Sequence, residues 1–280
     1  MEIIIPKYLS DYFVSLSKEC GVVLSDAQKR WYAMKYKELG DQIKQEYPST
    51  PEESFMGSSE GFWYLKELNE AYQDKRVTKV PYQPQVPVQT AWDLGFRDKT
   101  SIWFYQQLPS GSLHVIDYYE NSGEGLIHYV SYINTTPYKN NIFKHHMPHD
   151  AAAHDIASGL SVYKQAKELG LDVNILSRYN TGNSKSKFLL EVQRVRNLLS
   201  RCYFDESKCA VGLKCLMSYK KKWNETMSCY TDEAIHDWAS HGADAFRYLA
   251  QAAETQSLRK EKSKIEEDRA KLRMARRRMV

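Results

Sequence analysis

The sequence lacks several features that would define its class at once. No apolar run approaches the roughly 20 residues of a transmembrane helix, and the first residues carry no basic leader, so neither a membrane span nor a signal peptide is expected. No glycine is followed by lysine, which excludes a GxxxxGK[ST] phosphate-binding loop in this sequence. The five cysteines form no CxxC pair, which predicts reduced thiols in a cytosolic protein instead of a disulfide or zinc framework.

The charge is unevenly distributed along the chain. The 280 residues are 42% hydrophobic and 26% charged, as in ordinary globular proteins, and the formal net charge is +4. Residues 259–280 hold ten basic and four acidic side chains, whereas the rest of the chain holds 29 basic and 31 acidic ones. The basic tail is suited to contact a polyanion, although a solvated terminal helix explains it equally well.

Helix signals and proline content predict how the chain is divided. Residues 1–47 have helical spacing, with Ser25 as a candidate N-cap, and a short helix is expected near residues 64–73. Three prolines in residues 78–90 predict an extended linker. The predicted units are residues 1–77, the linker 78–90, a main domain 91–253 and a basic tail 254–280.

The main domain has the pattern of a mixed α/β fold. Segments 88–96, 100–108 and 113–121 are predicted strands, and the short turns between them indicate an antiparallel meander. Helices and strands then alternate, which predicts a mixed sheet with helices on both faces. The expected elements are helix 123–134, strand 141–150, helix 157–170, strand 171–178, and helices 184–201, 206–223 and 242–260.

Three acids lie at the ends of predicted elements. Asp93 is in the first strand, Asp150 ends the fourth, and Asp244 is in the first turn of the last helix. Taken singly, each has an ordinary explanation: a solvent-facing strand residue, a helix N-cap and a charge favoured by the helix dipole. Together they would form an oxygen-only site suited to Mg²⁺ or Mn²⁺. Asp98, in the turn after the first strand, is a further candidate metal ligand, or else a turn cap.

Basic side chains next to these acids are weaker candidates for binding a substrate. His149 precedes Asp150, and His241 precedes Asp244 by three residues. Elsewhere, a glycine-containing turn at a helix N-terminus is surrounded by basic residues that suit a phosphate, although a solvated capping loop is the simpler interpretation. These basic residues are Arg178, Lys185 and Lys187.

Four histidines fall close together at the end of the predicted strand 141–150. They are His145, His146, His149 and His154. Because neighbouring strand residues point to opposite faces, His145 and His146 are not expected to meet at one ion. A zinc site is therefore disfavoured, and buried or capping histidines are expected.

Four segments, considered together, resemble a known family. They are EYPSTPEESF (46–55), WDLGFRDKTSIWF (92–104), MPHDA (147–151) and HDWASHGADAFRYLA (236–250). In this order they resemble the large subunit of tailed-phage terminases, the DNA-packaging motors. The resemblance implies a packaging ATPase followed by a nuclease of ribonuclease H-like fold. Residues 1–77 would then be the end of the ATPase domain and a connector, forming a helical N-terminal extension.

The resemblance also implies a catalytic centre and a function. Its triad of acids, carried over by motif, falls on Asp93, Asp150 and Asp244, with two divalent cations, Mg²⁺ or Mn²⁺, and with Asp93 bridging them. Two such ions, about 3.5–4 Å apart, stabilise the attacking and leaving oxygens of phosphodiester hydrolysis. The implied function is a metal-dependent endonuclease that cuts concatemeric double-stranded DNA. Without the phosphate-binding loop, this chain is expected not to hydrolyse ATP.

The resemblance further implies partners and a location. The partners are a small terminase subunit, a portal protein and the ATPase domain missing from this chain, without a membrane. The expected location is the cytoplasm of an infected or lysogenic bacterium, outside the stable virion. Two alternatives stay open: another ribonuclease H-like nuclease, of resolvase or integrase type, and a module that grips DNA without cutting it.

Overall fold

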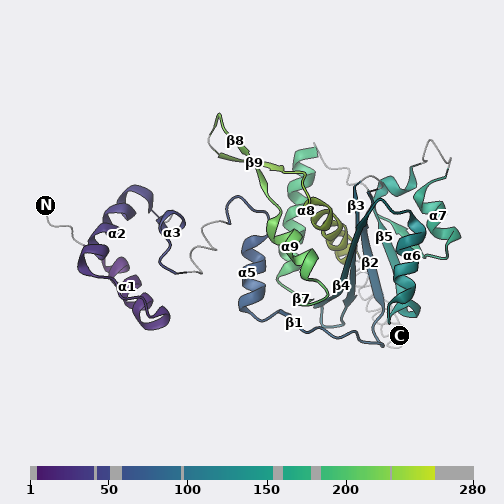
Figure 1. Cartoon of the computed structure of the whole chain (residues 1–280), viewed down its shortest axis with the longest axis horizontal. Coiled ribbons are helices and arrows are strands. Elements are labelled where there is room, and N and C mark those ends of the chain that lie inside the picture. The colour runs from purple at the N-terminus through teal and green to yellow at the C-terminus, as the bar shows by residue number, and fades with distance from the viewer. Residues whose placement is uncertain are drawn as a thin grey trace, which may run out of the picture.

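The computed structural model describes residues 5–40, 43–50, 59–95, 98–153, 160–177, 184–227 and 229–255. The chain begins with three helices, α1 (Lys7–Cys20), α2 (Asp26–Leu39) and α3 (Ile43–Glu46), which share a small core of their own (Figure 1). Ser25 caps α2 and forms a capping box with Gln28. The helical N-terminal extension is therefore confirmed in the described residues. The predicted connector over 51–58 lies outside them, as do residues 256–280 of the basic tail.

A seven-stranded mixed sheet forms the centre of the molecule. Its order is β1-β7-β4-β3-β2-β5-β6. β2, β3 and β4 are antiparallel neighbours, as predicted, while β5, β6, β7 and β1 join in parallel. The strands are β1 (Val77–Thr78), β2 (Val88–Asp93), β3 (Lys99–Gln107), β4 (Leu113–Ser122), β5 (Ile142–Met147), β6 (Val173–Ile175) and β7 (Cys202–Asp205). This arrangement confirms the predicted mixed sheet, in which three antiparallel strands are followed by parallel ones.

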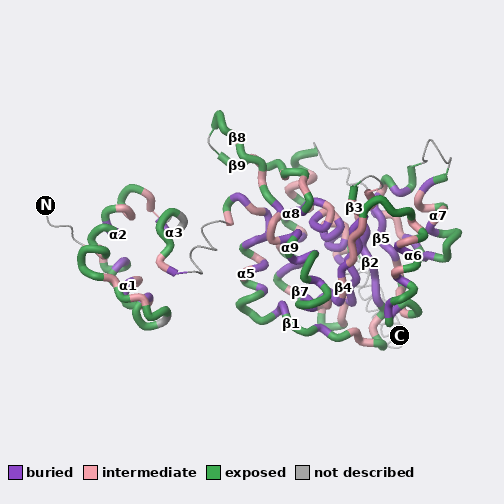
Figure 2. Tube along the Cα trace, viewed as in Figure 1, coloured by how far each residue is buried: buried purple, intermediate pink, exposed green. Residues whose placement is uncertain are grey.

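Helices cover both faces of the sheet, so its strands are buried (Figure 2). α6 (Leu126–Thr135) and α7 (Val162–Glu168) lie on one face. The other face carries α5 (Leu65–Gln73), α8 (Ser184–Leu199), α9 (Ala210–Ser218) and a helix over 240–255. β3 supplies Ile102 and Phe104 to the first core and Trp103 and Tyr105 to the second, as strand alternation requires.

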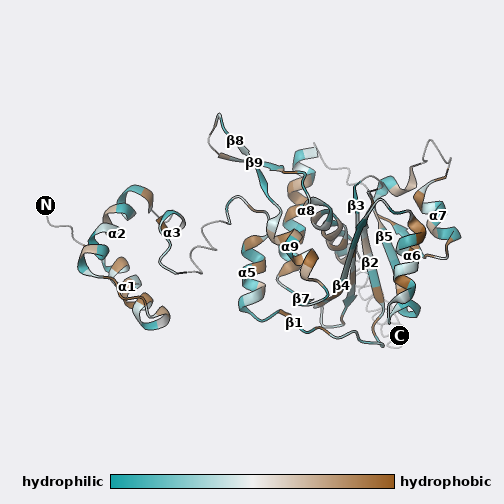
Figure 3. Ribbon diagram, viewed as in Figure 1, coloured by the Kyte–Doolittle hydropathy of each residue, from teal (hydrophilic) through white to brown (hydrophobic). Residues whose placement is uncertain are grey.

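The hydropathy of the helices differs with their packing. Figure 3 contrasts α2, largely hydrophilic, with α9, which is more hydrophobic and contributes Leu213 and Leu216 to the core. Within the part of the chain that is described, no helix has both the length and the apolar character needed to cross a bilayer.

Two strand regions differ from the sequence-based prediction. The sequence does not predict β7, because its four residues are too few to show the alternation of apolar and polar side chains that identifies a strand. In the structure β7 lies between β1 and β4 in the sheet. The helix expected over 206–223 ends at Ser218, and a hairpin of β8 (Lys221–Asn224) and β9 (Cys229–Ala234) follows. β8 and β9 have no buried residue among those described, so they lack the apolar pattern that identifies a strand.

The predicted linker 78–90 does not separate α5 from the sheet. The helix expected near 64–73 is α5, and Trp63, Tyr64 and Leu68 share a core with α8 and α9. β1 then pairs with β7, and Val80 and Val88 are buried. These contacts make α5 and β1 part of the core of the sheet, while the division into domains stays a prediction.

Candidate metal centre

Asp93 and Asp150 lie at the same edge of the sheet. Asp93 is the last residue of β2, and β5 runs parallel to β2. Asp150 follows β5, in the short 3₁₀ helix His149–Ala152. The carboxyl ends of parallel strands meet at one edge, which is where α/β sheets present ligand-binding groups. The topology therefore brings both acids to the part of the sheet that suits a ligand.

The helix over 240–255 brings the third acid to this edge. Its first turn packs closely because Gly242 has no side chain: an added Cβ would lie 2.8 Å from Cβ of Cys215 and from Oη of Tyr118. The carbonyl of Gly242 also accepts a hydrogen bond from Nε1 of Trp103 at 2.8 Å. This close contact fixes where His241 and Asp244 lie.

Asp93 is a part-buried carboxylate that accepts a hydrogen bond from the last helix. His241 Nδ1 donates to its Oδ2 at 3.2 Å, and only 17% of the Asp93 side chain is exposed. Burial raises the pKa of Asp93, the hydrogen bond from His241 lowers it, and the negative charge of Asp244 raises it again. A cation beside Asp93 would relieve both effects that disfavour its charged form.

Asp244 is held in place through one of its two oxygens. Its Oδ1 accepts hydrogen bonds from Arg247, by Nη2 at 2.7 Å and Nε at 3.2 Å, and from the hydroxyl of Tyr219 at 3.3 Å. Arg247 also donates to Glu191 at 2.6 Å. Since every hydrogen bond that Asp244 accepts from described residues goes to Oδ1, Oδ2 is the oxygen available for a cation.

The negative charges of all three acids raise the pKa of one hydroxyl group, that of Tyr248. Burial is the main cause that raises the pKa of Tyr248, followed by the negative charge of Asp93, which Arg247 opposes. Asp244 and Asp150 raise it further. Asp150 itself is exposed and lines a pocket of about 380 Å³. The three acids thus lie near one hydroxyl group, although among the described residues their ligand atoms do not all lie within 4.8 Å of one another. Carboxylate oxygens are ligands that suit Mg²⁺ or Mn²⁺.

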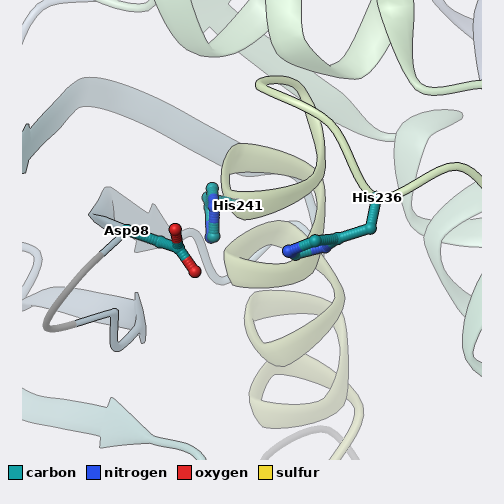
Figure 4. Close-up of side chains that lie close together, drawn as sticks. All are labelled: Asp98, His236 and His241. Atoms are coloured by element: carbon teal, nitrogen blue, oxygen red, sulfur yellow. The ribbon is translucent and has the colours of Figure 1, made fainter.

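A second group of side chains lies next to this centre. Asp98, His236 and His241 each offer a ligand atom, and these atoms all lie within 4.8 Å of one another (Figure 4). Asp98 and His241 are candidates from the sequence, whereas sequence reasoning missed His236. The only signal for it was a second histidine five residues before His241, in a segment that forms a loop.

The two lysines predicted to bind phosphate are paired with acids. Lys185 lies 3.1 Å from Asp232 of β9, and Lys187 lies 3.8 Å from Glu191, one turn along α8. Arg178, the third member of that group, lies outside the described residues. His149 is half-buried in the 3₁₀ helix beside Asp150. The roles of these residues toward a substrate stay predictions.

The predicted histidine cluster is split by the sheet. His145 Nδ1 lies 2.8 Å from the hydroxyl of Thr90, while His146 contacts Gln89 and Asn174. Burial lowers the pKa of both histidines to about 4. They are neutral core residues with partners of their own, on opposite faces of the strand. His154 lies outside the described residues.

Comparisons with known proteins place the fold. No protein-family model matches the sequence, and no curated protein sequence does either. The large terminase from a thermophilic bacteriophage, solved in complex with ATP-gamma-S, matches at a TM-score of 0.51 and 18% identity, over 76% of this chain and 52% of that chain. This chain thus spans about half of that protein.

Two nuclease structures match less well. The P22 large terminase nuclease domain has a TM-score of 0.49 and 14% identity, over 64% of this chain and 89% of that one. The large terminase nuclease from thermophilic phage G20c with bound magnesium has a TM-score of 0.45 and 11% identity, over 68% and 97%. The predicted resemblance is confirmed at the level of the fold: over about three quarters of its length, this chain has the fold of a phage large terminase.

Proposed function

We propose that this chain is the nuclease part of a viral DNA-packaging terminase and hydrolyses phosphodiester bonds in double-stranded DNA. The observation that carries the proposal is the position of Asp93 and Asp150 at one edge of a sheet with the terminase fold, where these acids and Asp244 all raise the pKa of Tyr248. The negative charge of Asp244 disfavours the charged form of Asp93, and a divalent cation bound by these acids would relieve that repulsion.

Each acid has a definite part in this proposal. Asp93, the most buried, would hold two Mg²⁺ or Mn²⁺ ions in common, with Asp150 and Asp244 each holding one. When bound, such ions supply an activated water and stabilise the departing 3′ oxygen. Arg247 and Tyr219 orient the Asp244 carboxylate, and His241 orients Asp93 and favours its charged form.

The substrate and partners follow from the same proposal. Phosphate contacts give affinity without sequence information, so we expect sequence-independent cutting with a steep dependence on salt. The complete machine would include a packaging ATPase, a small terminase subunit and a portal, working in the cytoplasm of an infected or lysogenic bacterium. Because the sequence has no phosphate-binding loop, ATP hydrolysis belongs to the ATPase and not to this chain.

The test is cleavage of supercoiled plasmid by the full chain with Mg²⁺, Mn²⁺ or EDTA. Asp244→Asn keeps the shape and removes the charge, and Asp172→Asn makes the same change at an exposed ion pair with Lys144. We expect cleavage that needs the metal, is lost in Asp244→Asn and persists in Asp172→Asn. DNA binding without cleavage would indicate a gripping module, and a preference for branched DNA or RNA–DNA hybrids would indicate a resolvase-type nuclease.

A further inference from the structure

The group of Asp98, His236 and His241 differs chemically from the three acids beside it. Its three ligand atoms come from three places: the turn after β2, the loop before the last helix, and the first turn of that helix (Figure 4). The two imidazole rings are 5.3 Å apart, at an angle of 76°. Two nitrogen ligands and one carboxylate therefore face a common point at the surface.

Both imidazoles are held by their Nδ1 atoms. His241 Nδ1 donates to the carboxylate of Asp93 at 3.2 Å. His236 Nδ1 lies 3.1 Å from Oγ of Ser240, whose only hydrogen is donated to the carbonyl of Asp237 at 2.6 Å. Ser240 must therefore accept a hydrogen bond from His236 Nδ1. In the neutral form of both rings the unprotonated nitrogen is then Nε2, which is how metal-binding histidines are usually oriented by their neighbours.

We propose that Asp98, His236 and His241 bind one transition-metal ion of the Zn²⁺, Co²⁺ or Ni²⁺ type, at a site distinct from the three-carboxylate centre. Imidazole nitrogen suits these ions, whereas Mg²⁺ prefers oxygen ligands. Zn²⁺ binds nitrogen and oxygen ligands at about 2.0–2.2 Å, so the three side chains must move slightly closer together. Asp98 and His236 are exposed and have room to do so. Three protein ligands leave a position for water.

This proposal does not depend on the nuclease function, because the test measures binding and not cleavage. The protein is the untagged full chain with Cys20→Ser and Cys229→Ser, since both of these exposed thiols would themselves bind such ions. Co²⁺ is titrated in excess Mg²⁺, which competes for oxygen-only sites, and is followed by calorimetry and by its visible absorption. We expect one Co²⁺ per chain with nitrogen ligation.

Three variants locate the ion. His236→Ala and Asp98→Asn should each weaken Co²⁺ binding at least tenfold. His128→Ala is the matched control, because His128 also lies near a carboxylate, 3.8 Å from Glu124, and should leave binding unchanged. Unfolding temperatures measured without metal show whether each variant folds.

Two results would overturn the proposal. One is Co²⁺ binding that is unaffected by both His236→Ala and Asp98→Asn in folded protein. The other is Co²⁺ binding that is lost in Asp244→Asn but kept in His236→Ala, which would place the ion among the three carboxylates. A chain that binds Co²⁺ as expected but cuts no DNA would leave this site standing and refute the nuclease alone.

Discussion

His241 donates a hydrogen bond from Nδ1 to Oδ2 of Asp93 at 3.2 Å, which joins the last helix to the end of β2. The same contact raises the pKa of His241, despite the opposing effect of its burial, and lowers that of Asp93. Each side chain therefore stabilises the charged form of the other. A histidine three residues before Asp244 thus helps to keep a different acid, on a different element, ionised.

Removing this hydrogen bond should weaken the metal centre. In His241→Ala the pKa of Asp93 rises further, because burial and Asp244 still disfavour its charge. We expect the affinity for Mn²⁺ to fall about 10- to 100-fold, as is usual when a partner of a metal ligand is lost. We also expect the pH below which activity is lost to move to a higher value. Calorimetric titration with Mn²⁺ at several pH values measures the first effect, and cleavage at the same pH values measures the second. His241→Asn retains a hydrogen-bond donor and should lose less. Equal affinities in wild type and His241→Ala would contradict this role.

Arg247 should stabilise the fold as well as position Asp244. It is paired with Asp244 and Glu191, and only 13% of its side chain is exposed. Arg247→Met leaves part-buried Asp244 without its cation and Glu191 with Lys187 alone, at 3.8 Å, which should cost about 3–5 kcal/mol of unfolding free energy. Urea unfolding measures this loss. Arg201→Met is the comparison and should cost much less. Arg201 is also part-buried, but it donates a long hydrogen bond, of 3.4 Å, to the neutral carbonyl of Gly111.

The buried histidines predict loss of stability in acid. The pKa of His146 in the folded chain is about 4, below its usual value of 6.5, because burial disfavours the imidazolium. The unfolded chain therefore takes up a proton first. The stabilisation from neutral His146 is complete above about pH 6.5 and is lost as pH falls toward 4, by an amount on the order of 3 kcal/mol.

Urea midpoints measured from pH 7.5 to 4.5 test this prediction. The wild type should lose stability steadily below about pH 6.5, and His146→Gln should be less stable at pH 7.5 but flatter with pH. His128→Gln, at a half-exposed position on α6, should keep the slope of the wild type. Parallel curves for His146→Gln and wild type would show that other groups cause the acid loss.

Gly242→Ala should displace the start of the last helix. The new Cβ would lie 2.8 Å from Cβ of Cys215 and from Oη of Tyr118, so the first turn must move away from the sheet. We expect a cost of about 1–3 kcal/mol, as in other overpacked cores, and a larger proportional loss of cleavage, because His241 and Asp244 move together. At Gly125 an added Cβ meets nothing within 4 Å, so Gly125→Ala should preserve cleavage. Unchanged cleavage by folded Gly242→Ala would show that this contact does not position the acids.

The central part of the fold is predictable because its signals are local. The meander β2–β4 shows short strands with short turns, and α5, α6 and α8 show helical spacing. β7 and the β8–β9 hairpin escape prediction because β7 is short and the described residues of the hairpin are not buried. Strand pairing between distant segments also has no local signature.

The candidate site is predictable in its acids but not in the partners of those acids. The Asp244–Arg247 pair has the i, i+3 spacing of a helix and is readable from the sequence. The contacts of Tyr219 with Asp244 and of His241 with Asp93 join residues far apart in the chain, so only the packing of the last helix on the sheet reveals them. The partner of Lys185 lies on β9, a strand without an apolar pattern, so the sequence suggests an open phosphate contact where the structure has an ion pair.

The burial of β3 on both faces has a consequence for how the chain folds. Residues 100–106 are all buried, so this strand has no polar side and would be prone to aggregate if its edges were left unpaired. Both of its partners, β2 and β4, are its immediate neighbours in sequence. Pairing them requires only short loops to close, which is faster than bringing in β5 or β7. In the newly made chain, β3 is therefore prone to aggregate but is also paired early, by its neighbours in sequence.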